Sequence, residues 1–157
     1  MVRVGRRIFL SFDHDDRLQV QGFRLMQWNP NLDFEFTTRD LLTPVSSENP
    51  DYICAKIREQ MKGTSCIVVL LGKRTAQSYW VDFEIREALK DGKGVLGIRL
   101  KDAGGVAIPP ALEEAKAKVI DWDPHQFEDE INKACLIADR PLLAPPTRGS
   151  TSSVCGR

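Results

Sequence analysis

The sequence has no excess of either charge. Its 157 residues include 22 lysines and arginines and 22 aspartates and glutamates, which gives a formal net charge of +0. Proteins that bind nucleic acid or an anionic membrane through their overall charge carry a clear surplus of basic residues. We therefore expect neither nucleic acid nor a membrane as a partner, and any anionic ligand must be held by a local group of side chains.

Long apolar runs and grouped metal ligands are lacking as well. No segment approaches the length of a membrane span, and the apolar run after the basic N-terminus is broken by Ser11 and Asp13, too early for a signal peptide. The four cysteines form no C-x-x-C pair, and the two histidines do not lie near them in the sequence. These absences predict a cytoplasmic protein that holds no metal ion.

The length and composition suit one globular domain. With 42% hydrophobic and 28% charged residues, the chain has enough apolar side chains for a single core. We assign residues 1–140 to this domain. Residues 141–157 are dominated by proline, serine, threonine and glycine, so we predict a disordered tail there.

Apolar runs and helical patterns alternate along the chain. Runs rich in β-branched and apolar residues predict buried strands, and one segment that alternates between apolar and polar residues predicts a strand at a sheet edge. The predicted strands are residues 7–12, 33–37, 64–72, 94–100 and 117–122. The predicted helices are residues 16–28, 51–62, 79–90 and 124–138. The predicted loops are residues 38–50 and 101–110.

This alternation predicts an α/β fold with a doubly wound, mostly parallel five-stranded sheet that has helices on both faces. By analogy we expect the flavodoxin-like strand order 2-1-3-4-5. In such sheets, ligands bind beyond the carboxyl ends of the strands, near the point where the strand order reverses. The residues that follow these strand ends are therefore the candidates for a binding site.

Polar residues follow three of the predicted strands. Residues 11–16 include the last two residues of the first strand and the four residues after it. Arg39 follows the second strand, and residues 73–75 follow the third. Trp80 and Glu84 lie near the start of the next helix, one turn apart, so their side chains share one side of it. An aromatic ring beside a carboxylate suits a flat base or pyridine ring that is held against a group able to stabilise positive charge.

The acidic cluster at residues 13–16 allows a second interpretation. Asp13-His14-Asp15 matches the D-x-D motif of phosphatases, in which carboxylates chelate magnesium, but Arg17 stands where that motif has threonine or valine. Aspartates at a helix start also cap the helix and interact favourably with its dipole. A magnesium-dependent phosphohydrolase that uses Asp13 and Asp15 stays open as an alternative.

Two glycine motifs fail in their context. The segment Gly92–Gly97 satisfies G-x-G-x-x-G, but it leaves a helix and enters a strand, which is the reverse of a dinucleotide-binding motif. The segment Gly72–Thr75 is similar to the end of a P-loop, yet its lysine and threonine are not adjacent and Ile67 stands where the upstream glycine should be. These departures exclude a P-loop kinase or NTPase.

Four segments together resemble the TIR-like proteins of bacterial Thoeris antiphage defence. These segments are residues 9–16, 64–72, 80–85 and 94–98, and the resemblance extends over roughly residues 6–100. Its most specific part is the spacing of Thr75, Trp80 and Glu84 after a Leu-Leu-Gly strand end. The resemblance implies that Glu84 is the catalytic glutamate of an enzyme that cleaves NAD+.

The resemblance also implies the products and the partners. NAD+ is then a substrate and not a bound cofactor, and the enzyme releases nicotinamide and makes a cyclic or conjugated ADP-ribose signal. This signal reaches a separate effector, self-association accompanies activation, and a phage-derived trigger starts the response. A non-catalytic TIR-like interaction module is the alternative. The expected substrate contacts are Ser11, Phe12, Asp13, His14, Arg39, Lys73, Arg74, Thr75 and Trp80.

The chemistry of NAD+ needs only one carboxylate. Nicotinamide leaves its pyridinium form as a neutral molecule, so it requires little assistance from an acid, whereas the hydrolysis of a sugar glycoside normally uses two carboxyl groups. Glu84 would then act by stabilising the positive charge that develops on the ribose.

Overall fold

The structure is a computed structural model, and it describes residues 6–32, 34–38, 49–101 and 103–138. The predicted tail at residues 141–157 and the predicted substrate contact Arg39 lie outside these residues. Both therefore stay predictions.

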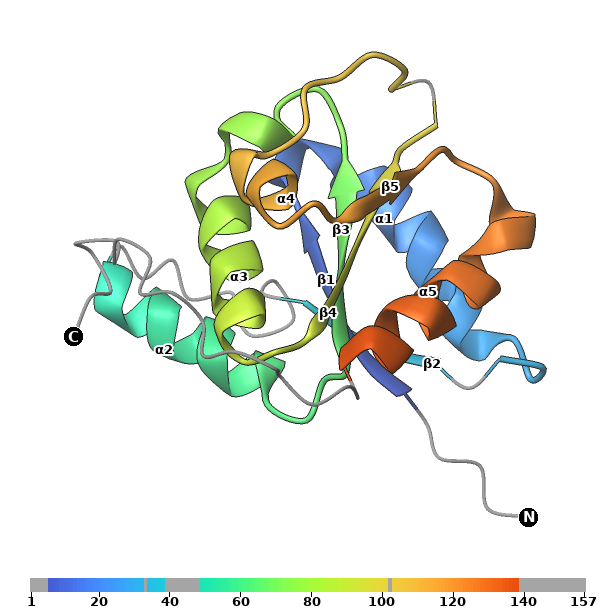
Figure 1. The fold of residues 1–157 in the computed structure, drawn as a ribbon, viewed down its shortest axis with the longest axis horizontal. Helices are drawn as coiled ribbons and strands as arrows, with labels where there is room; N and C mark the ends of the chain where they lie inside the picture. Colours follow the sequence, from blue (N-terminus) through green and yellow to red (C-terminus); the bar gives the residue numbers. More distant parts are fainter. Residues whose placement is uncertain (1–5, 33, 39–48, 102, 139–157) are drawn as a thin grey trace.

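The described strands form one parallel sheet of five strands in the order β2-β1-β3-β4-β5 (Figure 1). This confirms the predicted fold class and strand order, including the place of β2 at an edge. Consecutive strands run parallel because each connection crosses over the sheet through a helical segment. The strands are β1 (Arg6–Phe12), β2 (Phe34–Thr38), β3 (Cys66–Leu71), β4 (Gly94–Arg99) and β5 (Lys118–Ile120).

The four predicted helices are present, with two differences. The first helix is regular only to Arg24, and Leu25–Trp28 continue it as a 3-10 helix. A short helix, Pro110–Glu114, was not predicted; it begins at the proline that ends the predicted loop. The α-helices are α1 (Arg17–Arg24), α2 (Pro50–Met61), α3 (Tyr79–Lys90), α4 (Pro110–Glu114) and α5 (Pro124–Ala138). Two further 3-10 helices, His14–Asp16 and Thr75–Gln77, follow β1 and β3.

The helices cover both faces of the sheet. Figure 1 shows α2, α3 and α4 on one side and α1 and α5 on the other. Each side has its own apolar cluster, and successive residues of β3 contribute to the two clusters in turn, as Ile67 and Val68 do. All six side chains of β3 are buried, which explains its unbroken apolar sequence.

No helix in the described part of the chain is long and apolar enough to cross a membrane.

Candidate functional site

Glu84 lies on α3, which packs against the sheet on the same side as α2 and α4. The helix starts after Ser78, whose Oγ accepts a hydrogen bond of 3.3 Å from the Val81 amide. Val81, Ile85 and Ala88 form the stripe that faces the core. Glu84 lies beside this stripe and is only 1% exposed. Its carboxylate is therefore inside the protein and not in the surrounding solvent.

The hydroxyl of Ser11 contacts the carboxylate of Glu84. Ser11 Oγ donates a hydrogen bond of 2.7 Å to Glu84 Oε1, and Ser11 is itself fully buried. A short hydrogen bond to a carboxylate is strong where water is excluded. Ser11 is the last residue but one of β1, and the strand order reverses between β1 and β3. The contact therefore holds Glu84 at the end of the sheet where this type of fold binds ligands.

Trp80 lies one turn before Glu84 and is partly buried. Its ring meets the rings of Tyr79 and Phe83 edge to face, with centroid separations of 5.0 Å and 5.8 Å. The three rings form an aromatic group at the start of α3. A stacking contact between Trp80 and a substrate ring stays a prediction.

The loop after β3 is closed by the buried hydroxyl of Thr75. The Gly72 amide donates a hydrogen bond of 2.7 Å to Thr75 Oγ1, and that hydroxyl lies 3.4 Å from the carbonyl oxygen of Leu70, to which it donates. Thr75 is 0% exposed. Its hydroxyl therefore maintains the shape of the loop, and a direct contact with substrate requires the loop to open.

Asp16 packs against this loop. A Cβ atom at Gly72 would overlap the Asp16 carboxylate, so the absence of a side chain at residue 72 makes room for it. Burial raises the pKa of the Asp16 carboxyl above its ordinary value of 3.8, and the charges of Asp13 and Asp15 raise it further. The nearby Thr75 hydroxyl has the opposite effect on this pKa. The protein thus holds a partly desolvated acid beside the end of β3.

The other polar residues after β1 each have a local contact. Asp13 Oδ2 accepts a hydrogen bond of 3.1 Å from the Asp15 amide, which caps the 3-10 helix that follows. His14 Nε2 lies 2.9 Å from Arg17 Nη1. Asp15 Oδ2 forms an ion pair of 3.1 Å with Arg74 Nη1, and this pair joins the end of β1 to the loop after β3. The carboxylates therefore have different neighbours.

No group of three or more histidine, cysteine, aspartate or glutamate side chains in the described residues is arranged to hold a metal ion. The divergent contacts of Asp13, Asp15 and Asp16 agree with this finding, because shared magnesium coordination needs carboxylate oxygens that converge on one point. The arrangement does not favour the phosphohydrolase alternative.

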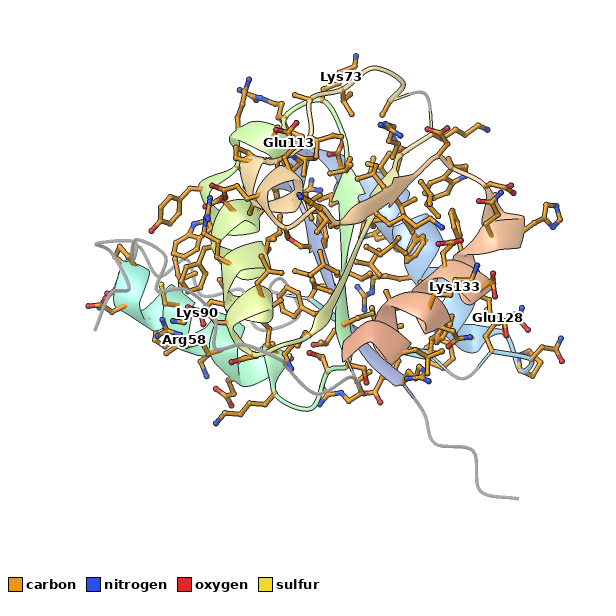
Figure 2. The ribbon with its side chains drawn as sticks, in the orientation of Figure 1. Arg58, Lys73, Lys90, Glu113, Glu128 and Lys133 are labelled. Atoms are coloured by element: carbon orange, nitrogen blue, oxygen red, sulfur yellow. The ribbon has the colours of Figure 1, made fainter. Side chains whose placement is uncertain are left out.

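The structure does not bring every predicted residue close to Glu84. Phe12 follows Ser11 on β1, so it points to the opposite face, where it joins the core cluster beside α1 and α5. Lys73 is exposed in the loop after β3, at the top of the view in Figure 2. Of the predicted contacts, Ser11 is the one with a described bond to Glu84.

The sequence of the chain also matches a known protein family. A family model described as "Thoeris protein ThsB, TIR-like domain" matches residues 9–104, which run from β1 through β4 and include Glu84. The chain belongs to this family. It is therefore a TIR-type protein of the Thoeris antiphage defence, and the resemblance found in the sequence is confirmed. A comparison with curated proteins found no match.

Sequence reasoning missed two contacts in this Thoeris TIR-like protein. It did not predict that Ser11 donates a hydrogen bond to Glu84, and the role of Ser11 as a substrate contact stays a prediction. It also gave no role to Gly72, against which Asp16 packs. The glycine at the end of an apolar strand was a usable signal, because such a glycine often marks a close approach of another group. The Ser11 contact had no comparable signal in the sequence.

Proposed function

We propose that this Thoeris TIR-like protein cleaves NAD+ and makes an ADP-ribosyl signal. The bond between the nicotinamide nitrogen and C1′ of the ribose breaks, and its electron pair leaves with nicotinamide as a neutral molecule. The remaining ADP-ribosyl group carries positive charge on C1′ and the ring oxygen. A nucleophile then bonds to C1′ and loses a proton. That nucleophile is an atom of the ADP-ribosyl group itself, which gives a cyclic product, or a second molecule, which gives a conjugate.

The observation that carries this proposal is the position of Glu84. Its carboxylate is buried on α3, is held by Ser11, and lies at the carboxyl end of the sheet beside the reversal of strand order. A negative charge that is fixed in a place without water stabilises a developing cation more than it stabilises a ground state with diffuse charge. This is the assistance that departure of a neutral nicotinamide requires.

The burial of Glu84 adds a condition to the proposal. A carboxylate that is 1% exposed contacts a substrate only after neighbouring groups move. We propose that self-association, started by a phage-derived trigger, produces this movement and completes the cleft. The product then diffuses to a separate effector protein. Catalysis under this proposal is low in the isolated protein and rises on activation.

The test compares the Glu84→Gln variant with the wild type in two kinds of sample. The first is lysate from phage-infected cells that express each protein, and the second is each protein after purification. Mass spectrometry measures nicotinamide and ADP-ribosyl products from added NAD+. We expect wild-type lysate to release nicotinamide, and the variant to be at least about 100-fold slower, the usual loss when one charge-stabilising group is removed. Undiminished nicotinamide release from the variant in lysate overturns the proposal.

Glu87→Gln is the matched control. Glu87 is a second glutamate on α3, it is also buried, and it pairs with Arg58 of α2 at 3.1 Å. Its substitution removes a buried charge from the same helix without touching Ser11 or Glu84. We expect nicotinamide release by this variant to stay close to that of the wild type.

A non-catalytic interaction module is the second candidate, and one observation favours it. The near-complete burial of Glu84 and its bond to Ser11 also suit a carboxylate whose role is to hold α3 on β1. This candidate predicts that cells expressing the Glu84→Gln variant keep their resistance to phage, provided that the variant folds. Loss of resistance by a folded Glu84→Gln protein, while Glu87→Gln cells stay resistant, excludes it.

A further inference from the structure

A pocket of about 440 Å³ opens at the amino end of the sheet, away from Glu84. It lies between the last turn of α3, the starts of β4 and β5, the turn after α4, and the middle of α5. Gly94 and Lys118, the first residues of these two strands, both line it. Lys133 of α5 belongs to the lining and is labelled in Figure 2, where Lys73 lies at the top of the view, beyond the carboxyl ends of the strands.

The pocket is strongly basic although the chain as a whole is neutral. Four lysines and one carboxylate, that of Glu130, belong to its lining. Glu130 is nearly buried, and its carboxylate forms ion pairs with Lys118 at 2.8 Å and with Lys133 at 3.5 Å. Lys133 also forms an ion pair of 3.0 Å with Asp129, which lies outside the lining, so the positive charge that stays available in the lining is that of Lys93 and Lys116.

Two of the lysines have no carboxylate partner within the described ranges. Lys93 Nζ donates a hydrogen bond of 2.8 Å to the carbonyl oxygen of Thr64, which orients the ammonium group without neutralising it. Lys116 is exposed and forms no ion pair with a described residue. An anion that enters the pocket therefore meets ammonium groups whose charge is still available.

The backbone of Lys116 supports a specific role for this side chain. Its φ is 53°, and within the described ranges no other residue except glycine has a positive φ. Glycine or asparagine is the usual residue where a helix ends in this left-handed conformation. The chain has a lysine there despite the conformational cost. This lysine places a positive charge at the rim of the pocket.

The rest of the lining is mainly apolar. Side chains from α3, β4, the segment before β5 and α5 supply it, and the pocket volume lies in the range that holds a small organic ligand. Lysine binds phosphate as a compact point charge. The available lysine charges and the apolar lining together suit a ligand that has an anionic group at one end and a flat or apolar body at the other. The apolar lining residues that carry this argument are Leu89, Val95, Leu96, Ala117 and Ala134.

We propose that this pocket is a second ligand site, which binds a small organic phosphate. The phosphate lies among Lys93, Lys116 and Lys133, and the flat body packs against Leu89 and Val95. The site is separate from the cleft at Glu84, so the proposal does not depend on NAD+ cleavage. Binding weakens as salt is added, because the contacts to phosphate are electrostatic.

The test titrates the full chain with three probes: AMP, inorganic phosphate and adenosine. Calorimetry gives the affinities, and amide chemical shifts locate the bound probe. We expect AMP to bind at least about tenfold more tightly than either phosphate or adenosine, because each of those has only half of the required chemistry. We expect the largest shifts at Gly94, Lys116 and Ala134. Equal affinity for phosphate and AMP overturns the proposal, and so do shifts confined to Ser11 and Gly72.

Lys116→Asn separates binding from folding. Asparagine tolerates the left-handed conformation, so we expect the variant to be at least as stable as the wild type. We also expect its affinity for AMP to fall about fivefold or more, because one unneutralised charge is lost. Lys90→Gln, a neighbouring lysine outside the lining, should leave the affinity unchanged. An unchanged affinity in Lys116→Asn, or equal losses in both variants, contradicts the proposed site.

Discussion

At the carboxyl end of the sheet, Asp16 packs against Gly72 and Glu84 is held by Ser11, whereas at the amino end four lysines and one carboxylate line a pocket. Both regions belong to one chain whose charges cancel. Composition therefore excludes partners that are bound through net charge, but it does not exclude two local sites of opposite sign. The parallel arrangement separates the two regions, because all strand starts lie at one end of the sheet and all strand ends at the other.

The two ends also differ in how they use glycine. A Cβ atom at Gly94 would overlap the backbone carbonyl of Ala134 on α5, whereas a Cβ atom at Gly72 would overlap the side chain of Asp16. A backbone carbonyl within a helix moves only if the helix moves. The Asp16 carboxylate is only partly buried and belongs to a side chain, so it can rotate away without a shift of the backbone. The amino end should therefore be the more rigid of the two.

The largest expected effect tests this difference directly. Gly94→Ala should lower the free energy of unfolding by about 3 kcal/mol, since α5 must shift away from β4, whereas Gly72→Ala should cost only about 1 kcal/mol. Denaturant titration of both variants measures the two values. Gly22→Ala is the control, because no atom lies within 4 Å of the added methyl and alanine should stabilise α1 by about 1 kcal/mol. Equal costs at Gly72 and Gly94 would show that the two ends are equally rigid.

A smaller effect is expected at the carboxyl end when Ser11 is replaced. Ser11→Ala removes the described donor to the buried Glu84 carboxylate and should lower the free energy of unfolding by about 2 kcal/mol. The same substitution made in Glu84→Gln should cost only about 1 kcal/mol, because the amide is a neutral acceptor. Denaturant titration of the four proteins gives this difference. Ser65→Ala, before β3 at the amino end, is the control; a similar loss there would show that the Ser11 bond adds nothing special.

The smallest expected effect concerns pH. The pKa of Asp16 is raised in the folded protein, so the fold disfavours its charged form and loses stability as the pH rises past the unfolded value of 3.8. Asp16→Asn should therefore raise the melting temperature at neutral pH, and the gain should disappear below pH 3.8, where Asp16 is protonated in both states. Glu128→Gln, an exposed carboxylate on α5, is the control. A gain that does not change with pH would rule out the charge of Asp16 as its cause.

Much of the fold could be predicted because its signals are local. The apolar run at β3 and the helical stripe of α3 are each visible within a dozen residues. The helix α4 could not be predicted in this way, because its five residues, which begin at the second of two prolines, show less than two turns of periodicity. The change of α1 into a 3-10 helix at Leu25 was equally invisible, because both forms place apolar residues at similar spacings.

The arrangement of the candidate site could be predicted only where its residues lie close together in the sequence. Trp80 and Glu84 share a helix, so their spacing already placed them on one side of it. Phe12 was assigned to the cleft although strand alternation places it opposite to Ser11, a conflict that the sequence already contained. The lysine pocket was not predicted, because its residues come from the end of α3, the starts of β4 and β5, the turn after α4 and the middle of α5, which are distant in the chain.

The amino-acid sequence by itself determined the α/β architecture and the order of the elements, because each depends on periodicity within short segments, whereas the choice of Glu84 as catalytic residue came from the family resemblance and stays a prediction. Only the tertiary structure decided that Ser11 bonds to Glu84 across 73 positions, that Asp16 occupies the space beside Gly72, and that lysines from several elements line one pocket. These contacts form when crossover connections bring strand ends together, and neither local spacing nor composition specifies which side chains then meet.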